Sequence, residues 1–425
     1  MVSRMRRRLF LGAAALSFAA GAAWWGRDWL PLRGLINPCL APALPDRLAE
    51  HPVVRDVLAG LDPAKLWDCH VHLVGTGDSD PAKAWVNPAL DSIWHPSQFL
   101  QKRLYTNAAC VDDAVGGDAS FLARLASLID PDSGMRLMLL AFDYNHGVDG
   151  RRRPELSTFF VANEYTQSVA AARSNWEWIC SVHPYREDAL EALEWAAAHG
   201  ARAVKWLPPA MGMDPASPRC DRFYQTLQRL DLPLLTHGGH ELAAEGGGHQ
   251  DYGDPLRLRR PLEQGVRVIV AHCASLGETA KGGESGNPSR GLRNFQAFLG
   301  MMREPAHEKL LFGDLSAVTQ INRAPEALQT LLLAEDLHHR LLNGSDYPLT
   351  GILPLFSLHQ LERLGLLDPQ TADVVAEIQK HNPLLFDLVL KRNLVWQRHR
   401  FPRQVFETAD FFLPNGHHLP GQHLI

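Results

Sequence analysis

The stretch LWDCHVHLVG, residues 66–75, places two histidines one position apart at the end of a short apolar run. A run of this length predicts a β-strand, on which side chains two positions apart point to the same face. Asp68, His70 and His72 are therefore expected on one face, with the intervening residues on the other. Buried polar groups need partners, and two neighbouring imidazoles favour a metal ion over a hydrogen-bond network.

Seven further runs read as strands, and segments with helical periodicity separate several of them. One such segment is 186–200, which ends at a glycine. Strands that alternate with helices indicate a parallel sheet with crossover helices, and eight of them predict an α/β fold, the closed (β/α)8 TIM barrel. The alternative is an open doubly wound sheet, but no glycine-rich phosphate loop follows the first strand. The expected strands are 65–73, 135–143, 178–184, 201–207, 232–238, 266–273, 309–316 and 340–346.

Two long connections interrupt this pattern, at residues 74–134 after the first strand and 274–308 after the sixth. Both leave the carboxyl ends of strands, which form the active-site face of a barrel. Connections of this length in a compact domain usually carry function, so they are predicted to be long insertions beside the site.

Composition limits the classes of function. The chain has 425 residues, of which 46% are hydrophobic and 21% charged, as in ordinary globular proteins. A net charge of −5 gives no basic excess, so no nucleic-acid partner is indicated. Six cysteines without a CxxC pair argue against a zinc knuckle and against a small disulfide scaffold. Cys69 and Cys180 lie in strand-like runs and are expected to be free buried thiols.

The N-terminus reads as a targeting segment. The stretch RRRLFLGAAALSFAAGAA, residues 6–23, joins an arginine pair and Phe-Leu to a small-residue apolar run, as in a twin-arginine export signal. This predicts a periplasmic or exported protein that meets the twin-arginine translocation machinery. Cleavage near residue 22 and retention as an inner-membrane anchor are both open, because the apolar run is near the lower limit for a spanning helix. The expected organisation is a signal or anchor at 1–30, a lead-in at 31–64, a metal-dependent barrel at 65–395 and a tail at 396–425.

Polar residues fall at the carboxyl ends of the expected strands, which converge on one pocket in a barrel. Imidazoles and a carboxylate suit Zn2+, and Mn2+ or Fe2+ would accept the same ligands, with one or two ions bound. His183, His240 and Arg290 are candidates for substrate binding, with solvated surface positions as the alternative. The candidate metal ligands are His70, His72, Lys205, His237, His272 and Asp346, of which Asp346 and His272 are also the candidate catalytic residues.

The motifs DCHVH, LLTHGG, VIVAHC and LLNGSDYP occur in order over roughly residues 65–395. Together they resemble the amidohydrolase superfamily, and most closely the amidohydrolase-related branch that includes aminocarboxymuconate-semialdehyde decarboxylase. That resemblance implies a metal-dependent (β/α)8 barrel with one ion held through His70, His72, His237 and Asp346, and with His272 in catalysis.

Lys205 leaves the number of metal ions open. Phosphotriesterase-like members of the superfamily use a carboxylated lysine to bridge two metals, and Lys205 occupies a comparable place; His237 and His272 would then serve the second ion. The alternative is a lysine that faces helices or pairs with Asp314 or Asp143.

The expected activity is that of an exported metal-dependent hydrolase. It would act on a C–N or C–O bond of a small carbonyl compound, such as an amide, lactone or ester, through metal-activated water. Asp346 would orient that water, accept its proton and return it to the leaving group, and His272, if not a ligand, would polarise the carbonyl. The alternatives are a metal-dependent non-oxidative decarboxylase of the same superfamily and a non-catalytic ligand-binding barrel. An exposed barrel helix leaves room for a homodimer.

Overall fold

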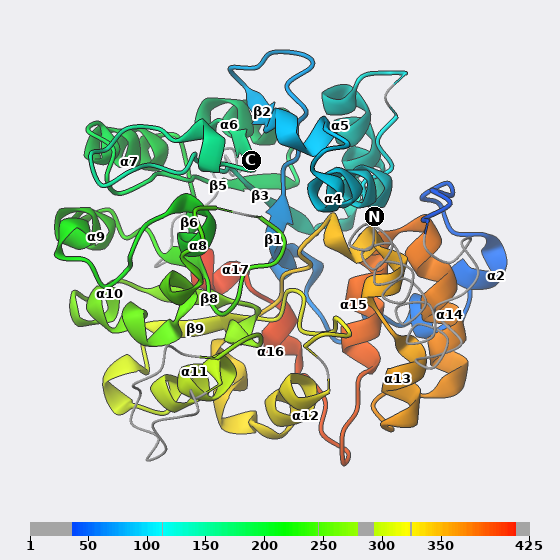
Figure 1. The fold of residues 1–425 in the computed structure, drawn as a ribbon. Coiled ribbons are helices and arrows are strands. Elements are labelled where there is room, and N and C mark those ends of the chain that lie inside the picture. Colours follow the sequence, from blue (N-terminus) through cyan, green and yellow to red (C-terminus); the bar gives the residue numbers. More distant parts are fainter. Residues whose placement is uncertain (1–35, 113, 245, 279–292, 324, 414–425) are drawn as a thin grey trace, which may run out of the picture.

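A computed structural model describes residues 36–112, 114–244, 246–278, 293–323 and 325–413. Eight parallel strands form the barrel (Figure 1), and each lies at one of the runs read as strands from the sequence. Two single bridges, Cys180 to Val204 and Val71 to Tyr347, join its three-stranded and five-stranded parts into a closed ring. The predicted TIM barrel is therefore confirmed. In order around the ring the strands are β1 (Trp67–His72), β3 (Arg136–Leu140), β5 (Trp176–Ile179), β6 (Val204–Trp206), β7 (Leu234–His237), β8 (Val268–Ala271), β9 (Leu311–Asp314) and β10 (Leu341–Leu342).

Alternation along the strands separates two apolar layers. Ile269 and Ala271 of β8 belong to the inner cluster that fills the barrel, whereas Val268 and Val270 belong to the outer cluster between strands and helices. This is the period of two that a strand imposes. Burial on both sides explains why the strand runs are continuously apolar in sequence.

The first strand departs from the expected alternation. Its register shifts between Asp68 and Val71, and Cys69 lies in the inner cluster while Val71 lies in the outer one. Asp68 accepts hydrogen bonds from the backbone N–H groups of His70 (3.1 Å) and Ser345 (2.8 Å). The expectation that Asp68 shares a face with the two histidines is therefore wrong, because the irregularity shifts the alternation by one residue.

Close contact between β1 and the residues after β10 positions the site. A Cβ added at Gly344 would lie 2.7 Å from the Cβ of His70, so only glycine permits this approach. The backbone N–H of Asp346 donates to the carbonyl of His70 at 2.8 Å, and that of His72 to the carbonyl of Tyr347 at 2.8 Å. The two segments that carry the predicted ligands are thereby fixed against each other.

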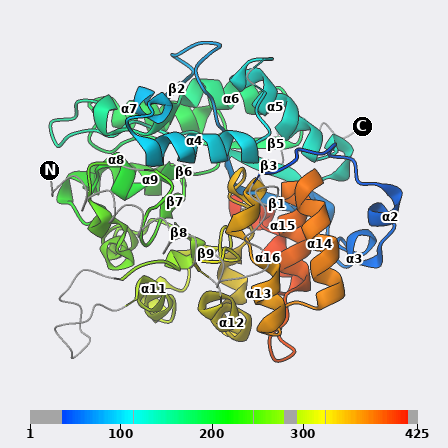
Figure 2. The same cartoon turned by 45° about the vertical axis from the view of Figure 1, so that its right-hand side comes forward.

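Helices surround the barrel, and α13, α14 and α15 form a group at one side of it (Figure 1 and Figure 2). The expected helix 186–200 is present as α7 and is followed by Gly200 in the left-handed region. The helices α6 to α15 are α6 (Asn163–Ala171), α7 (Ala189–Ala198), α8 (Pro208–Met211), α9 (Asp221–Arg229), α10 (Arg259–Glu263), α11 (Asn294–Met302), α12 (Glu326–Leu333), α13 (Leu358–Arg363), α14 (Pro369–His381) and α15 (Pro383–Asn393).

The connection between β1 and β3 carries structure of its own. It holds β2 (Ala84–Val86), α4 (Pro96–Ala108) and α5 (Gly117–Leu128), and β2 pairs antiparallel with β4 (Phe159–Val161) outside the barrel. Residues 279–292 of the second long connection, which include Arg290, lie outside the described residues.

The described part of the predicted tail closes the amino-terminal end of the barrel. It contains α16 (Arg403–Phe406) and α17 (Ala409–Phe412), and Ala409 and Phe412 join the inner apolar cluster. The Thr408 hydroxyl is hydrogen-bonded to the carbonyl of Trp67, at the start of β1. These residues therefore belong to the barrel core.

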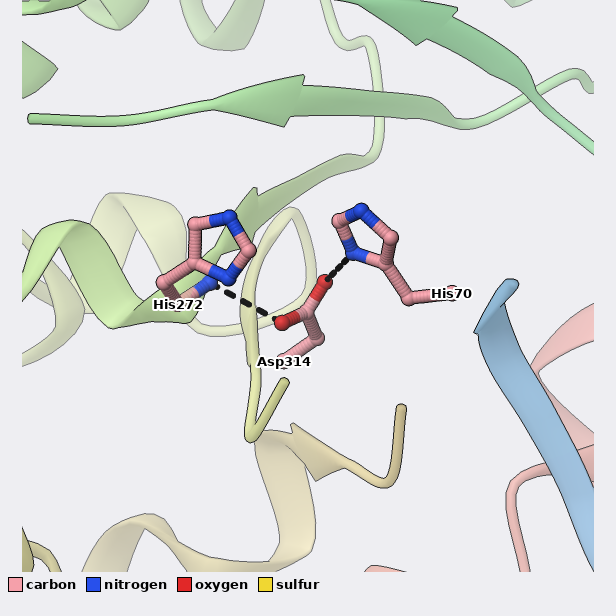
Figure 3. Close-up of side chains that lie close together, drawn as sticks. All are labelled: His70, His272 and Asp314. Atoms are coloured by element: carbon pink, nitrogen blue, oxygen red, sulfur yellow. Dashed lines mark hydrogen bonds and ion pairs between the residues drawn. The ribbon is translucent and has the colours of Figure 1, made fainter. Parts of the chain in front are cut away.

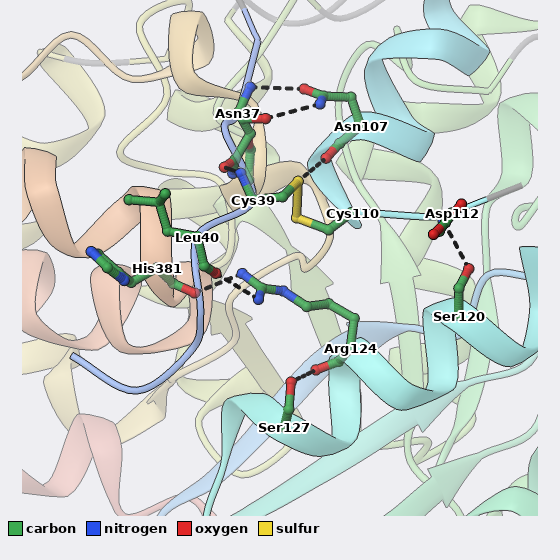
Figure 4. The surroundings of a disulfide bond; sticks show 11 residues. Asn37, Cys39, Leu40, Asn107, Cys110, Asp112, Ser120, Arg124, Ser127 and His381 are labelled. Atoms are coloured by element: carbon green, nitrogen blue, oxygen red, sulfur yellow. Dashed lines mark hydrogen bonds between the residues drawn. A yellow bond between two sulfur atoms is a disulfide. The ribbon is translucent and has the colours of Figure 1, made fainter. Parts of the chain in front are cut away.

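A disulfide ties the lead-in to the barrel. Cys39 is bonded to Cys110, just after α4 (Figure 4), and Arg124 donates to the carbonyls of Leu40 (2.9 Å) and His381 (2.6 Å) beside it. The sequence gives no local signal for a pair separated by 71 residues. Cys69 and Cys180 are free and buried, as expected, and so are Cys220 and Cys273. The lead-in also contains α2 (Asp46–Ala49) and α3 (Pro52–Arg55).

The predicted signal or anchor at 1–30 lies outside the described residues. Among the helices that are described, none is both long enough and apolar enough to cross a bilayer.

Candidate active site

His70, at the carboxyl end of β1, is held in one tautomer by Asp314 of β9 (Figure 3). Its Nδ1 lies 2.8 Å from the Asp314 Oδ2, and because a carboxylate only accepts, Nδ1–H is the donor. Nε2 is then an acceptor, and the Lys205 Nζ lies 3.0 Å from it. Burial lowers the pKa of His70 to about 4, so the ring is neutral near pH 7. A neutral imidazole with one nitrogen held by a carboxylate is the usual state of a metal-binding histidine.

Asp314 links several elements of the site. Its Oδ1 accepts from the backbone N–H groups of His272 (2.9 Å) and Ser316 (3.0 Å), and the Ser316 hydroxyl is bonded to the same oxygen. Burial opposes the charge, but the neighbouring His70 and these donors hold the pKa of Asp314 well below its usual range. The sequence placed Asp314 only as an alternative partner of Lys205, although GDLS at the end of the seventh strand was the available signal.

Three predicted ligands converge: His70, His72 and Asp346. The Asp346 Oδ1 lies 3.1 Å from the His72 Nε2 and 3.5 Å from the His70 Nε2. Burial alone would raise the pKa of Asp346, but the hydrogen bond from His72 and the nearby His70 lower it to about 2. Asp346 has a φ of 63°, a left-handed conformation that an aspartate adopts at some cost and that directs its carboxylate toward β1.

Lys205, from β6, joins the same group. Its Nζ lies 3.0 Å from the His70 Nε2, and the side chain is fully buried. Burial lowers its pKa, while Asp314 and Asp346 act in the opposite direction. The contact of Lys205 is thus with a predicted ligand, and neither Asp314 nor Asp143 forms an ion pair with it among the described residues.

His272 lies beside His70 with ring centroids 5.2 Å apart, and it forms a second convergent group with His70 and Asp314. Its Nδ1 lies 3.0 Å from the carbonyl oxygen of Ser316, so Nδ1 carries the proton and Nε2 is an acceptor. Burial lowers the pKa of His272 well below its usual range. In this neutral tautomer His272 can bind a cation or take a proton, which disfavours the expected role of polarising a carbonyl.

His237, at the end of β7, lies next to His272 with ring centroids 5.3 Å apart but belongs to neither of the convergent groups found among the described residues. Its Nδ1 lies 3.2 Å from the Glu241 Oε2, and its Nε2 lies 3.2 Å from the carbonyl of His240. Glu241 repeats the carboxylate support that Asp314 gives to His70. The sequence analysis missed Glu241, which sits four residues after His237 in THGGHE.

Of the predicted substrate-binding residues, His183 is buried and its ring is held by the backbone. Both ring nitrogens of His183 bond to backbone, Nε2 to the carbonyl of Met211 at 3.0 Å and Nδ1 to the N–H of Tyr185 at 3.1 Å. Its ring therefore has no free donor or acceptor for a substrate. His240 is exposed, and Arg290 lies outside the described residues. The structure also places Arg323, which the sequence analysis missed, against the turn that carries His272: its Nη1 donates to the Ser275 Oγ at 3.2 Å.

The donor set fits a divalent cation. The structure contains two groups of residues whose candidate ligand atoms lie within 4.8 Å of one another inside each group. The first is His70, His72 and Asp346, and the second is His70, His272 and Asp314. Neutral imidazoles and ionised carboxylates are the ligands that zinc and similar ions prefer. Because Asp314 already accepts from His70 and from backbone donors, the first group is the better candidate for direct binding.

Comparisons with known proteins identify the family. The model of the family described as Amidohydrolase matches residues 134–384. No curated protein matches the chain. Solved structures similar to this one include an uncharacterised TIM-barrel protein from Bordetella bronchiseptica, at 14% identity and a TM-score of 0.44, covering 76% of this chain and 99% of that one. Another is a probable 2-pyrone-4,6-dicarboxylic acid hydrolase from Acinetobacter baumannii, at 14% identity and a TM-score of 0.39, covering 75% and 96%.

A third is 5-carboxyvanillate decarboxylase from Sphingomonas paucimobilis, at 11% identity and a TM-score of 0.36, covering 61% and 79%. The family match spans more than half of the sequence and includes four of the six predicted metal ligands, Lys205, His237, His272 and Asp346. The chain therefore belongs to the amidohydrolase family.

Proposed function

We propose that this protein is an exported, metal-dependent hydrolase that cleaves a C–N or C–O bond of a small carbonyl compound. The observation that carries the proposal is the convergence of His70 Nε2 and His72 Nε2 on the Asp346 Oδ1. These three residues would hold a divalent ion such as Zn2+. A bound ion would supply a Lewis acid for the substrate carbonyl and lower the pKa of a water to near neutrality.

The chain's own residues supply the proton transfers. Asp346, with a pKa near 2, is ionised at neutral pH and can accept a proton from the attacking water and return it to the leaving group. His272 lies beside His70, presents an unprotonated Nε2 and can hold a proton during the same cycle. Asp314 fixes the ring of His70, and the carbonyl of Ser316 fixes the ring of His272, so neither ring has to reorient during the reaction.

Export is part of the proposal and is supported by the disulfide. A bond between Cys39 and Cys110 forms and persists in an oxidising compartment such as the periplasm, and is rare in a reducing cytosol. The arginine pair in residues 6–23 supports the twin-arginine route. A fusion that remains cytoplasmic when Arg7 and Arg8 are intact would contradict this part of the proposal.

Non-oxidative decarboxylation is the competing reaction, because the buried Lys205 could hold a carboxylate at the same centre. Incorporation of oxygen from labelled water into the product indicates hydrolysis. Release of carbon dioxide without such incorporation indicates decarboxylation.

The test combines metal content with activity. Protein purified without a chelator or an affinity tag is expected to contain at least one zinc per chain and to hydrolyse a member of a panel of amides, lactones and esters. Asp346→Asn should lower kcat by about 10²- to 10⁴-fold, the usual loss for a general acid–base group, with the fold retained. Asp410→Asn, which changes an exposed carboxylate paired with Lys65, is the matched control. Wild-type kcat in Asp346→Asn would refute the assignment.

A further inference from the structure

Lys391 of α15 is a fully buried cation that no step described so far uses. Its Nζ lies 2.6 Å from the Oδ2 of Asp387, one turn earlier on the same helix, and both side chains are shielded from solvent. The same Nζ donates to the carbonyl of Gly344 at 2.7 Å and lies 3.5 Å from the Asn343 Oδ1. Each of the three ammonium protons therefore has an acceptor.

The ion pair with Asp387 is poorly arranged for stability alone. Burying two charges is costly, and their attraction offsets that cost only where the remaining polar atoms also have partners. The Asp387 Oδ1 is buried and has no hydrogen-bond partner among the described residues. Burial raises the pKa of this carboxyl to about 7, while Lys391 acts in the opposite direction. The pair is therefore weak evidence for a purely stabilising role.

The second contact of Lys391 reaches the segment that carries Asp346. On one side this segment is bonded to β1, because the N–H of Asp346 donates to the carbonyl of His70 at 2.8 Å. The carbonyl of Gly344, two residues before Asp346, instead accepts from α15 through Lys391. The segment is thus held from both sides, by a strand that carries candidate ligands and by a helix behind it.

Asp346 needs this support because of its backbone. Its φ of 63° is a left-handed conformation, which persists in a residue other than glycine only where the surrounding contacts over-determine it. Gly344 is buried, so its carbonyl would have no partner without the Lys391 donor, and the segment would shift to recover a hydrogen bond. The Asp346 carboxylate would then move relative to His70 and His72.

We propose that Lys391 is a positioning residue: by holding the carbonyl of Gly344, it fixes the Asp346 carboxylate in the geometry that binds the metal ion. The inference rests on the proposed function for the ion, but the placement of the segment can be measured without metal or turnover. It gives a part in the site to α15, a helix that supplies no ligand to the convergent groups found among the described residues.

Two variants separate positioning from stability. Asp387→Asn breaks the ion pair but leaves Lys391 able to donate to Gly344, whereas Lys391→Met combined with Asp387→Leu removes both charges and the donor. Breaking one half of a buried pair is strongly destabilising, and replacing both halves by apolar residues is often close to neutral. A purely structural role therefore predicts that Asp387→Asn is the more damaged protein in every assay. Positioning predicts the opposite order at the site.

Zinc affinity and hydrogen exchange, both measured on the full chain, report the site. The double variant should bind zinc about tenfold more weakly than the wild type, the lower end of the loss for residues that support ligands. Backbone amides of residues 341–349 should exchange at least about tenfold faster in it, as followed by mass spectrometry. Asp387→Asn should have a lower thermal unfolding midpoint, with zinc affinity and exchange in 341–349 close to those of the wild type.

Arg136→Met is the matched control. It removes one of the two arginines that pair with the buried Glu177, at the start of β3. This variant should lower the thermal unfolding midpoint and change neither zinc affinity nor exchange in 341–349.

Results that follow stability instead would overturn the inference. These are wild-type zinc affinity and exchange in a folded double variant, or a tenfold loss in Asp387→Asn. If the double variant does not fold, Asp387→Asn decides: retained zinc affinity with a lowered midpoint supports positioning, and lost affinity refutes it. A wild type that holds no zinc and hydrolyses nothing would refute the proposed function, and the hydrogen-exchange comparison would then decide the positioning role by itself.

Discussion

Asp314→Asn is expected to weaken metal binding by changing the tautomer of His70. The Asp314 Oδ1 faces three donors: the backbone N–H groups of His272 and Ser316 and the Ser316 hydroxyl. The asparagine carbonyl must stay on that side, because an amide NH2 there would meet donors only. The NH2 group then faces His70 Nδ1, 2.8 Å away in the wild type, and donates to it. The proton of His70 moves to Nε2, the nitrogen that should bind the ion.

The magnitude follows from this single contact. Metal binding in the variant requires Nε2 to lose its proton, which restores Nδ1–H against the NH2 group of the asparagine. The lost charge-assisted hydrogen bond is worth about 1.5 to 3 kcal/mol, or roughly 10- to 100-fold in metal affinity. Three of the four bonds that Asp314 accepts remain, so the fold should be retained.

Zinc affinity is measured by competition with a chromogenic chelator, and far-UV circular dichroism reports the fold. Glu177→Gln is the matched control, because it also removes a buried carboxylate charge, one paired with Arg136 and Arg202 at β5. It should lower stability and leave zinc affinity unchanged. An Asp314→Asn protein that binds zinc as tightly as the wild type would refute the tautomer argument.

Three further outcomes are expected. Burial lowers the pKa of His183 to about 3, so below about pH 6.5 the unfolded chain binds a proton that the folded chain does not. The stability of the fold should therefore fall by up to about 1.4 kcal/mol per pH unit as the pH is lowered. The thermal unfolding midpoint of His183→Asn should depend less on pH than that of the wild type between about pH 6.5 and 4, and an equal dependence would contradict this. Removing the Cys39–Cys110 bond, which joins residues 71 positions apart, should lower the stability of the fold by about 4 kcal/mol. Reductant should lower the thermal unfolding midpoint of the wild type, and Cys39→Ser should show the same lower midpoint in the absence of reductant. An unchanged wild-type midpoint in reductant would contradict this prediction. Lys205→Ala should leave one zinc per chain by elemental analysis if Lys205 only contacts His70, whereas a fall from two to one would show that it bridges two ions.

The barrel could be predicted because its signals are local. Each parallel strand is buried on both faces and so appears as a short apolar run, and the helices between them show their own periodicity. The polar residues at strand ends could be recognised for the same reason: His70, His72, Lys205, His272 and Asp346 each interrupt or end such a run. Parallel strands bring their carboxyl ends together whatever the loops do, so this part of the site followed from the strand order alone.

Contacts between distant segments decided the rest. The register shift in β1 turns Asp68 away from the two histidines, and it arises from pairing with β3 and with the residues after β10, which the ten residues of the motif do not encode. Orientation separates His237 from the other ligands, because Glu241 and the backbone of His240 hold its ring. The disulfide joins cysteines 71 positions apart.

Asp314 and Arg323 show the same division. Each looks ordinary in sequence, and each acquires its contacts from the fold: Asp314 from donors of separate segments, and the half-buried Arg323 from Ser275 in the turn that carries His272. Sequence determined which residue types end the strands. Only the tertiary structure determined which atoms face one another, because hydrogen-bond direction, tautomer and desolvation depend on neighbours that lie far apart along the chain.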